Sequence, residues 1–353
     1  PAYAMLRSLV GSEMCIRDSG IINHLQNGNH VWGTMETTRI AGGLGNDTIT
    51  AGVKRLVTAG GSGNDIITGS TQKDIIWGDG WNFLKNDVFA KNQHQNIHGG
   101  NHTDIYSQYF TNGSSNLVSG DDTIKTGIGD DIVYGGGGND NISGGEGNDY
   151  IEGNDGNDTI EGGEGNNELK GGSGDDILSA GEGDDTLYAG DGDDKLYGES
   201  GNDLFVVNGS GNQVFDGGEG TDTFKLDISH YVPDVPNPSD FVYMADLNTG
   251  FTGSKNFPDI DNDILINIEN FDYTGLYKTE LIGDEKNNYL KSGSGDDLIT
   301  GGLGNDTIDG GKGNDIFVQG GNSDQWTIKY NQSIESLNST PQTITYDVTV
   351  GPR

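Results

Sequence analysis

From Leu117 to Val206 the sequence divides into ten units of nine residues: LVSGDDTIK, TGIGDDIVY, GGGGNDNIS, GGEGNDYIE, GNDGNDTIE, GGEGNNELK, GGSGDDILS, AGEGDDTLY, AGDGDDKLY and GESGNDLFV. Position six is an aspartate in every unit except at Asn167, and position eight is always apolar. Positions one to six predict a turn, because glycine accepts positive φ angles and lets carbonyl groups point inward. Positions seven to nine predict a short strand with one apolar side chain inward. One inward residue per unit cannot form a core, so the units must stack.

The same register occurs outside this run. The main block continues past a ten-residue slip, Val207–Asp216, to GGEGTDTFK and ends at residue 226. A first block, residues 42–80, contains GGLGNDTIT, a degenerate AGVKRLVTA, GGSGNDIIT and GSTQKDIIW. A third block, residues 283–327, contains GDEKNNYLK, SGSGDDLIT, GGLGNDTID and GGKGNDIFV. A disordered Gly/Asp-rich linker is the alternative, but it gives no reason to keep an apolar residue at every eighth position.

Stacked turns of this composition predict metal binding. They bring carboxylates and carbonyl oxygens within a few ångströms of one another, and Ca²⁺ takes six to eight such oxygens at ~2.3–2.6 Å. We therefore expect several Ca²⁺ ions, with the position-six aspartates as side-chain ligands. These candidate ligands are Asp47, Asp65, Asp74, Asp122, Asp131, Asp140, Asp149, Asp158, Asp176, Asp185, Asp194, Asp203, Asp222, Asp297, Asp306 and Asp315.

The units resemble the G-G-x-G-x-D-x-U-x repeats of the RTX family, the haemolysin-type calcium-binding repeats. The resemblance implies an all-β fold, a right-handed parallel β-roll (β-solenoid) with interspersed short β segments. Two nonapeptides then form one turn, and each ion lies between position-six residues two units apart. The implied pairs are Asp122/Asp140, Asp140/Asp158, Asp158/Asp176, Asp176/Asp194, Asp131/Asp149, Asp185/Asp203, Asp47/Asp65 and Asp297/Asp315. Asn167 departs from the consensus and puts the two sites that it touches in doubt.

Composition narrows the function classes. Of the 353 residues 61 are glycine, and Asp plus Glu outnumber Lys plus Arg by 55 to 19, a formal net charge of −36. Such a surface repels nucleic acid and anionic lipid, and at low divalent concentration its self-repulsion should keep the chain open. No apolar stretch approaches the ~18 to 20 residues of a membrane span.

The segments around the blocks carry weaker signals. Residues 1–19 include LVGSEMCIRDS, which resembles the translation of a transposon adapter used in sequencing libraries and contains the single cysteine, Cys15. We exclude it from fold reasoning, which leaves no cysteine for a disulfide framework. Residues 20–41 predict a lead-in strand. We expect the natural chain to extend beyond both ends, because no signal peptide precedes residue 20 and residues 328–353 resemble the start of a further β joint.

Two non-repeat segments separate the blocks. Residues 81–116 form an insertion with a degenerate repeat and three histidines, His94, His98 and His102. We interpret these as loop histidines rather than a zinc site, because Gln95 replaces the general-base glutamate of a zinc peptidase. Residues 227–282 predict a β-rich joint that ends in the I-x-N-I-E-N motif found between RTX blocks. The joint's DNDILI mimics an EF-hand loop, but Ile264 stands where the turn glycine belongs.

The resemblance implies a calcium-binding module of a secreted exoprotein, located outside the cell or at its surface. It would be exported by a type I secretion apparatus and fold on Ca²⁺ outside. Two alternatives stay open: the non-catalytic part of a secreted metallopeptidase, lipase or epimerase, and the spacer of a large adhesin or surface-layer protein with a cell-surface or glycan ligand. We expect no enzyme activity in this chain, since it has no Gly-x-Ser-x-Gly elbow, Cys/His pair or HExxH motif.

Overall fold

The computed structural model describes residues 30–33, 37–44, 46, 48–50, 55–79, 120–227, 241–255, 262–318 and 327–329. Within these ranges every regular element is a β-strand, and none of the residues forms a helix that could cross a membrane. The chain divides into two compact units, Pro1–Gly156 and Asn157–Arg353. Asp47, the histidines of the 81–116 insertion, Cys15 and the tail beyond residue 329 lie outside the described ranges.

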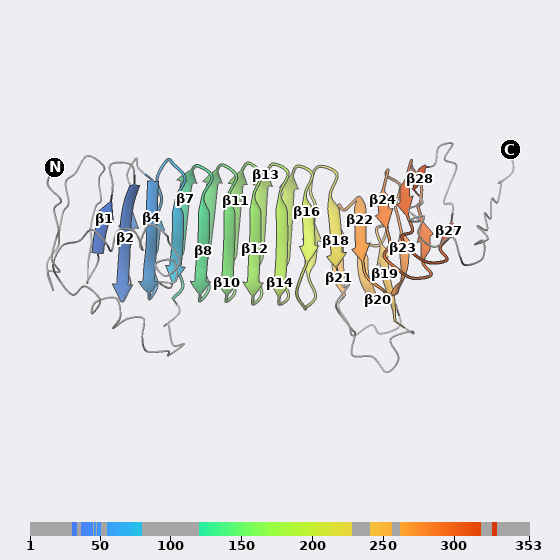
Figure 1. The fold of residues 1–353 in the computed structure, drawn as a ribbon, viewed down its shortest axis with the longest axis horizontal. Coiled ribbons are helices and arrows are strands. Elements are labelled where there is room, and N and C mark those ends of the chain that lie inside the picture. The colour runs from blue at the N-terminus through green and yellow to red at the C-terminus, as the bar shows by residue number, and fades with distance from the viewer. Residues whose placement is uncertain are drawn as a thin grey trace, which may run out of the picture. The chain divides into compact units, whose positions relative to one another are not determined.

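The first unit consists of two sheets of parallel strands, with β1 added antiparallel to β2. β1 and the even-numbered strands form one sheet, and the odd-numbered strands from β3 onward form the other. Two consecutive strands therefore make one solenoid turn (Figure 1). The strands are β1 (His30–Gly33), β2 (Thr37–Leu44), β3 (Thr48–Thr50), β4 (Arg55–Ser62), β5 (Ile66–Thr68), β6 (Ile75–Asp79), β7 (Thr123–Ile128), β8 (Ile132–Gly137), β9 (Asn141–Glu146) and β10 (Tyr150–Asp155).

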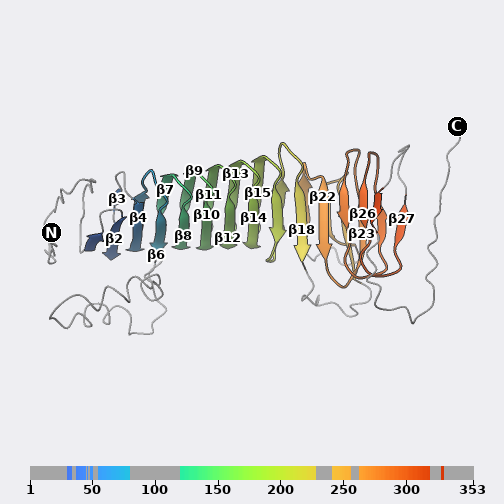
Figure 2. The ribbon, with the colours of Figure 1, turned by 45° about the horizontal axis from the view of Figure 1, so that its top comes forward.

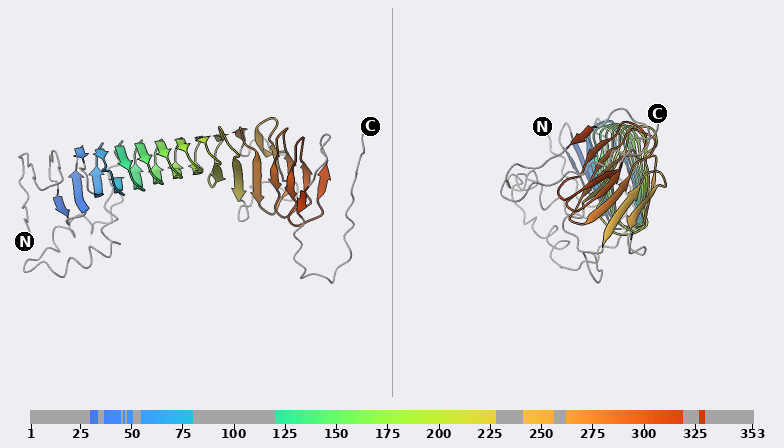
Figure 3. Two further views of the ribbon diagram at one scale, coloured as in Figure 1. Left: turned by 90° about the horizontal axis from the view of Figure 1, so that it is seen from above. Right: turned by 90° about the vertical axis from the view of Figure 1, so that its right-hand side faces the viewer.

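The second unit repeats this arrangement over a longer stretch, and its strands follow one another as a stack of short rungs (Figures 2 and 3). They are β11 (Thr159–Glu164), β12 (Glu168–Ser173), β13 (Ile177–Glu182), β14 (Thr186–Asp191), β15 (Lys195–Ser200), β16 (Leu204–Val207), β17 (Val214–Asp216), β18 (Thr223–Asp227), β19 (Val242–Asp246), β20 (Phe251–Ser254), β21 (Asp263–Ile266), β22 (Asn270–Thr274), β23 (Lys278–Ile282), β24 (Tyr289–Lys291), β25 (Leu298–Thr300), β26 (Thr307–Asp309), β27 (Ile316–Val318) and β28 (Thr327–Lys329).

The predicted parallel β-roll is confirmed in both units. Paired strands keep residues 18 positions apart in register, as Ile124 with Ile142 and Leu178 with Leu196. Position-eight side chains are buried to 1% exposure or less throughout the main block, from Ile124 to Phe205, so they form the core. Each contributes one rung to an apolar column between the sheets, which explains why the position is never polar.

The strands are longer than the repeat pattern predicts. In the main block, strands such as β8 run from position seven through position three of the next unit, six residues in place of three. The turn therefore covers only positions four to six. The glycine at position two takes a positive φ but stays in the ladder, as Gly127 does opposite Gly145. Backbone pairing thus extends over glycines that the sequence analysis assigned to the turn.

Both non-repeat segments leave the register of the solenoid intact. In the first unit, β5 pairs with β7 across a spacing of 57 residues, Ile66 with Thr123. Gly78 takes position one of a repeat whose positions four and six are Gly120 and Asp122. The insertion therefore stands in the chain where other repeats have position three. In the second unit, β18 pairs with β22, and the antiparallel strands β20 and β21 lie between β19 and β17.

Candidate metal sites

The position-six aspartates form a continuous hydrogen-bonded ladder within each unit. The backbone N–H of one aspartate donates to Oδ1 of the position-six aspartate two units later. The N···O distances are 2.8 Å for Asp122 to Asp140, 2.8 Å for Asp158 to Asp176 and 2.8 Å for Asp185 to Asp203. The predicted aspartate pairs whose two members lie in the same unit are therefore confirmed as neighbours. Asp47/Asp65 is the exception, because Asp47 lies outside the described residues. These bonds fix each carboxylate inside its turn, where it is almost fully buried.

The second carboxylate oxygen of this ladder lacks a hydrogen-bond donor. For eight of the aspartates, Oδ2 is buried and accepts no hydrogen bond from any described residue. These are Asp131, Asp176, Asp185, Asp194, Asp203, Asp222, Asp297 and Asp306. A buried carboxylate oxygen without a donor is costly, and native proteins rarely contain one unless a cation or water completes it.

Backbone carbonyls face the same oxygens. A Cβ placed on Gly171, at position one, would collide with Asp176 Oδ2 and would come 2.5 Å from the carbonyl oxygen of Ala189. A Cβ on Gly198 would collide with Asp203 Oδ2 and lie 2.6 Å from the carbonyl oxygen of Gly217. Two acceptors, one of them charged, thus converge at each turn with no donor between them. This is the oxygen-only donor set that Ca²⁺ prefers.

No described turn gathers three or more Asp, Glu, His or Cys side chains in a cluster that could hold a metal ion. A Ca²⁺ ion in a turn such as Gly171–Asp176 would therefore take most of its six to eight oxygens from backbone carbonyls and water. Zinc and other softer metals prefer nitrogen or sulfur ligands, and these turns offer none. The residues present fit calcium.

Burial and mutual repulsion raise the pKa of the ladder carboxyl groups. Desolvation, together with repulsion from the neighbouring carboxylates Asp158 and Asp194, raises the pKa of Asp176 to about 7, against the lowering effect of the Asp158 backbone N–H. Desolvation likewise raises the pKa of Asp203 to about 7 and that of Asp194 to about 6. The charged ladder is therefore unfavourable by itself, and a bound cation would relieve the cost of burying it.

Two position-six residues, the predicted ligand Asp74 and the non-consensus Asn167, differ from the rest. Both oxygens of Asp74 are occupied by protein donors: Oδ1 accepts the N–H of Leu56 at 2.5 Å and the Ser70 hydroxyl at 2.8 Å, and Oδ2 accepts the Ser70 N–H at 2.5 Å. Asp74 therefore has less capacity for an ion than its neighbours. Asn167 fills its turn with an amide: Nδ2 donates to the carbonyl oxygens of Gly165 at 3.1 Å and Ala180 at 3.4 Å.

A second ladder, at position five, was missed by the sequence analysis. There the backbone N–H donates in the opposite direction, to the Asp or Asn two units earlier. Asp193 donates to Asp175 Oδ1 at 3.0 Å, and Asn202 donates to Asp184 Oδ1 at 2.8 Å. These side chains are exposed. The signal was present in the sequence, since position five is Asp or Asn in all ten units from Leu117 to Val206, and these side chains hydrogen-bond readily to nearby backbone.

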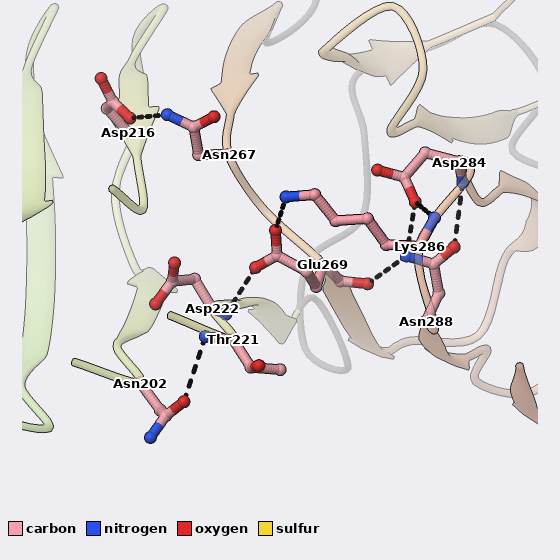
Figure 4. A network of polar contacts seen from close by, with 9 residues as sticks. All are labelled: Asn202, Asp216, Thr221, Asp222, Asn267, Glu269, Asp284, Lys286 and Asn288. Atoms are coloured by element: carbon pink, nitrogen blue, oxygen red, sulfur yellow. Dashed lines mark hydrogen bonds and ion pairs between the residues drawn. The ribbon is translucent and has the colours of Figure 1, made fainter. Parts of the chain in front are cut away.

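The joint places further residues at position six. Asp263 Oδ1 accepts the N–H of Gln213 at 3.0 Å, and Glu269 Oε2 accepts the N–H of Asp222 at 2.9 Å (Figure 4). Glu269 is the glutamate of the I-x-N-I-E-N motif, so this motif returns the chain to the register of the ladder. Spacings of 47 and 50 residues are not multiples of nine, and for that reason the repeat pattern alone could not find these two positions.

Comparison with known proteins agrees with this geometry. The RTX calcium-binding nonapeptide repeat family matches seven segments of the chain, several of them overlapping. They are residues 32–53, 59–80, 118–151, 134–169, 152–186, 170–205 and 282–317. No curated protein matches the chain.

Proposed function

Because the chain carries RTX calcium-binding nonapeptide repeats in several copies, we propose that it is the calcium-dependent folding module of a secreted exoprotein. The observation that carries this proposal is the row of buried Oδ2 atoms that face backbone carbonyls without a donor. Each such turn holds oxygen ligands for Ca²⁺ between two layers of the roll. Ion binding and folding would then be one equilibrium, since the ligands come together only in the folded chain.

The mechanism of calcium-dependent folding follows from the charges of the buried aspartates. In calcium-free solution, folding must bury a column of carboxyl groups whose neighbours repel them, as at Asp158, Asp176 and Asp194. One buried apolar side chain at position eight of each nonapeptide gives little hydrophobic stabilisation to offset this cost. With Ca²⁺ present, two positive charges per ion neutralise neighbouring carboxylates, and each occupied turn presents a template for the next.

Secretion is the biological setting that suits this chemistry. A chain that stays unfolded in a low-calcium cytosol and folds in a calcium-rich exterior is suited to export through a type I apparatus in the unfolded state. Within that setting, we favour a spacer of a long surface or adhesive protein over a segment of a secreted enzyme. The observation behind this preference is that strands on either side of each non-repeat segment still pair in parallel, β5 with β7 and β18 with β22, so the roll resumes after each segment.

Circular dichroism of the full chain tests the proposal. We expect weak β signal in a calcium-free buffer and a cooperative gain with millimolar Ca²⁺, whereas Mg²⁺ should substitute poorly because it requires a tight octahedron and releases its waters reluctantly. Identical spectra with and without Ca²⁺ would overturn the proposal. Peptidase, lipase or glycan-cleaving activity in the purified chain would instead support the enzyme alternative.

A further inference from the structure

Besides Asn167, several turns of the second unit place a residue other than aspartate at position six, and in three of these turns a protein donor meets the turn. The residues are Gln213, Glu269 and Asn288, and all three lie in or beside the joint. In the aspartate turns, one carboxylate oxygen accepts the ladder N–H and the other is left facing carbonyls. In the other three turns, a group of the protein takes the place that a cation would have in an aspartate turn.

At Glu269 the cation is a lysine. Its Oε2 accepts the Asp222 N–H in the way that an aspartate Oδ1 does, and its Oε1 is in an ion pair with Lys286 Nζ (Figure 4). The Glu269 side chain is 6% exposed, so this ammonium group meets a buried carboxylate. Lys286 therefore supplies, from within the chain, the positive charge that a Ca²⁺ ion would bring to an aspartate turn.

At Asn288 and Gln213 the donor is an amide. Asn288 Nδ2 donates to the carbonyl oxygen of Glu269 at 2.8 Å and to Asp284 Oδ1 at 3.0 Å, while its Oδ1 accepts the Asp284 N–H at 2.9 Å. Gln213 Nε2 donates to the carbonyl oxygen of Gly192 at 3.2 Å. An amide that donates to these carbonyls satisfies them directly, so neither turn needs an ion to complete its hydrogen bonds.

The core beside these turns is also different. From Ile124 to Leu196 each position-eight side chain is aliphatic, but from Phe205 onward aromatic rings pack edge to face or stacked against one another. The ring centroids lie 5.0 Å apart for Phe215 and Phe224, 5.3 Å for Phe224 and Phe271, and 5.7 Å for Tyr243 and Tyr273. Aromatic side chains bury more apolar area than Ile or Leu, and their edge and offset contacts stabilise the core beyond that burial.

From these two observations we infer that the described residues between 213 and 291 (213–227, 241–255 and 262–291) form a calcium-independent core, folded before Ca²⁺ binds, on which the aspartate turns order. The inference deepens the proposed function, since it rests on calcium-dependent folding of the rest of the roll. Asp222 is the one aspartate turn in this segment with an orphaned Oδ2, and its turn is expected to bind an ion without being required for the core. The core gives the first ion-bound turn on either side a preformed neighbour to stack on.

Hydrogen–deuterium exchange of the full chain, read peptide by peptide, tests the inference. In calcium-free buffer, peptides within 213–291 should exchange at least about tenfold more slowly than the same peptides in denaturant, while peptides within 158–203 should show no protection. With Ca²⁺, both sets should be protected. Free exchange of 213–291 without Ca²⁺, followed by protection of both segments with Ca²⁺, would overturn the inference and leave the proposed function standing. Absence of any calcium effect would overturn the proposed function instead.

A pair of variants tests the lysine directly, through the number of bound ions measured by native mass spectrometry. Lys286→Met keeps the side-chain length but frees the Glu269 carboxylate, and we expect one additional Ca²⁺ and weaker protection of the core without calcium. Glu269→Gln combined with Lys286→Met removes the free charge and should bring the ion count back to that of the parent chain. Lys312→Met, at an exposed position of the third block, is the matched control. An unchanged count in Lys286→Met would contradict the role of the ammonium group.

Discussion

The aspartate array (residues 158–203) and the joint, counted here with the turns on either side of it (described residues 213–227, 241–255 and 262–291), neutralise their turns in different ways. In the array, the turns of Asp176, Asp185, Asp194 and Asp203 leave a buried carboxylate oxygen without a donor. In the joint, the chain supplies the missing donor itself, through Lys286 and the amides of Asn288 and Gln213. The array also has an aliphatic core and the joint an aromatic one. Under the proposed function, calcium is therefore required by the aspartates at position six and not by the roll geometry itself.

The largest expected effects come from the two cores. Phe224→Ala should destabilise the joint by about 3–5 kcal/mol, and Leu196→Ala should destabilise the array by about 2–5 kcal/mol. Phe224 and Leu196 are both fully buried, so the pair is matched in exposure. The comparison predicts that Phe224→Ala removes exchange protection with and without Ca²⁺, whereas Leu196→Ala changes it only when Ca²⁺ is present. Equal effects of Leu196→Ala in both conditions would contradict the distinction between the two regions.

Substituting two neighbouring carboxylates in one turn distinguishes a loss of ion binding from a general change in net charge. Asp194→Asn and Asp193→Asn remove the same charge, one from the buried position-six ladder and one from the exposed position-five ladder. Asp194→Asn should raise the Ca²⁺ midpoint of folding at least about tenfold, the equivalent of about 1.4 kcal/mol. Asp193→Asn keeps its acceptor oxygen and should change the midpoint less than about twofold. Calcium titrations followed by circular dichroism measure both, and similar shifts would mean that position six has no special role.

Asn167 is the point in the array that most resembles the joint. Its amide donates to the carbonyl oxygen of Ala180, so we expect this turn to hold no ion, whereas the sequence alone put the two sites that Asn167 touches in doubt. Asn167→Asp should create an orphaned carboxylate oxygen, add one bound Ca²⁺ and sharpen the titration at a lower midpoint. Isothermal titration calorimetry of Ca²⁺ into the parent chain and into Asn167→Asp tests this prediction. Superimposable curves would show that the side-chain charge at this position does not govern binding.

The pH dependence should have opposite signs without and with calcium. Asp176 and Asp203 have a folded pKa of about 7, above the ~3.9 of an unfolded aspartate, so the folded array binds more protons. Their contribution to stability is fully present below about pH 4 and is lost as the pH rises through about 7. In calcium-free buffer the array should therefore gain β signal as the pH falls from 8 to 5.

With Ca²⁺ present, protons compete with the ion for the same carboxylates, and the calcium midpoint should rise as the pH falls below about 7. Circular dichroism at pH 5 and pH 8, with and without Ca²⁺, checks both signs. A calcium-free array that loses β signal on acidification would be incompatible with carboxyl groups that are buried side by side.

The sequence predicted the regular part of the molecule because its signals there are local and periodic. Stacking, the inward position eight and the pairing of aspartates 18 residues apart all follow from a nine-residue repeat, as Asp176 and Asp194 illustrate. Strand length was wrong because glycine can pair in a ladder at positive φ as well as form a turn, which composition cannot distinguish. Asp74 was assigned by its position alone, and the donors that occupy it, Leu56 and Ser70, depend on the fold.

The joint was harder to predict because its contacts are non-local. Glu269 reaches position six across 47 residues from Asp222, and Lys286 reaches Glu269 from the following turn of the roll. No spacing rule relates these residues. The I-x-N-I-E-N motif marked where the joint ends, but its role at position six depends on which strands the joint leaves paired.

The most direct test of the account is to locate the ions. A crystal structure of the chain grown in Ca²⁺, with anomalous difference density to identify the metal, should show an ion against Oδ2 of Asp176, Asp194 and Asp203. The same map should show Lys286 Nζ, and no metal, against Glu269. Aspartate turns that hold only water, or a Ca²⁺ ion bound to Glu269 in place of the lysine, would contradict the account.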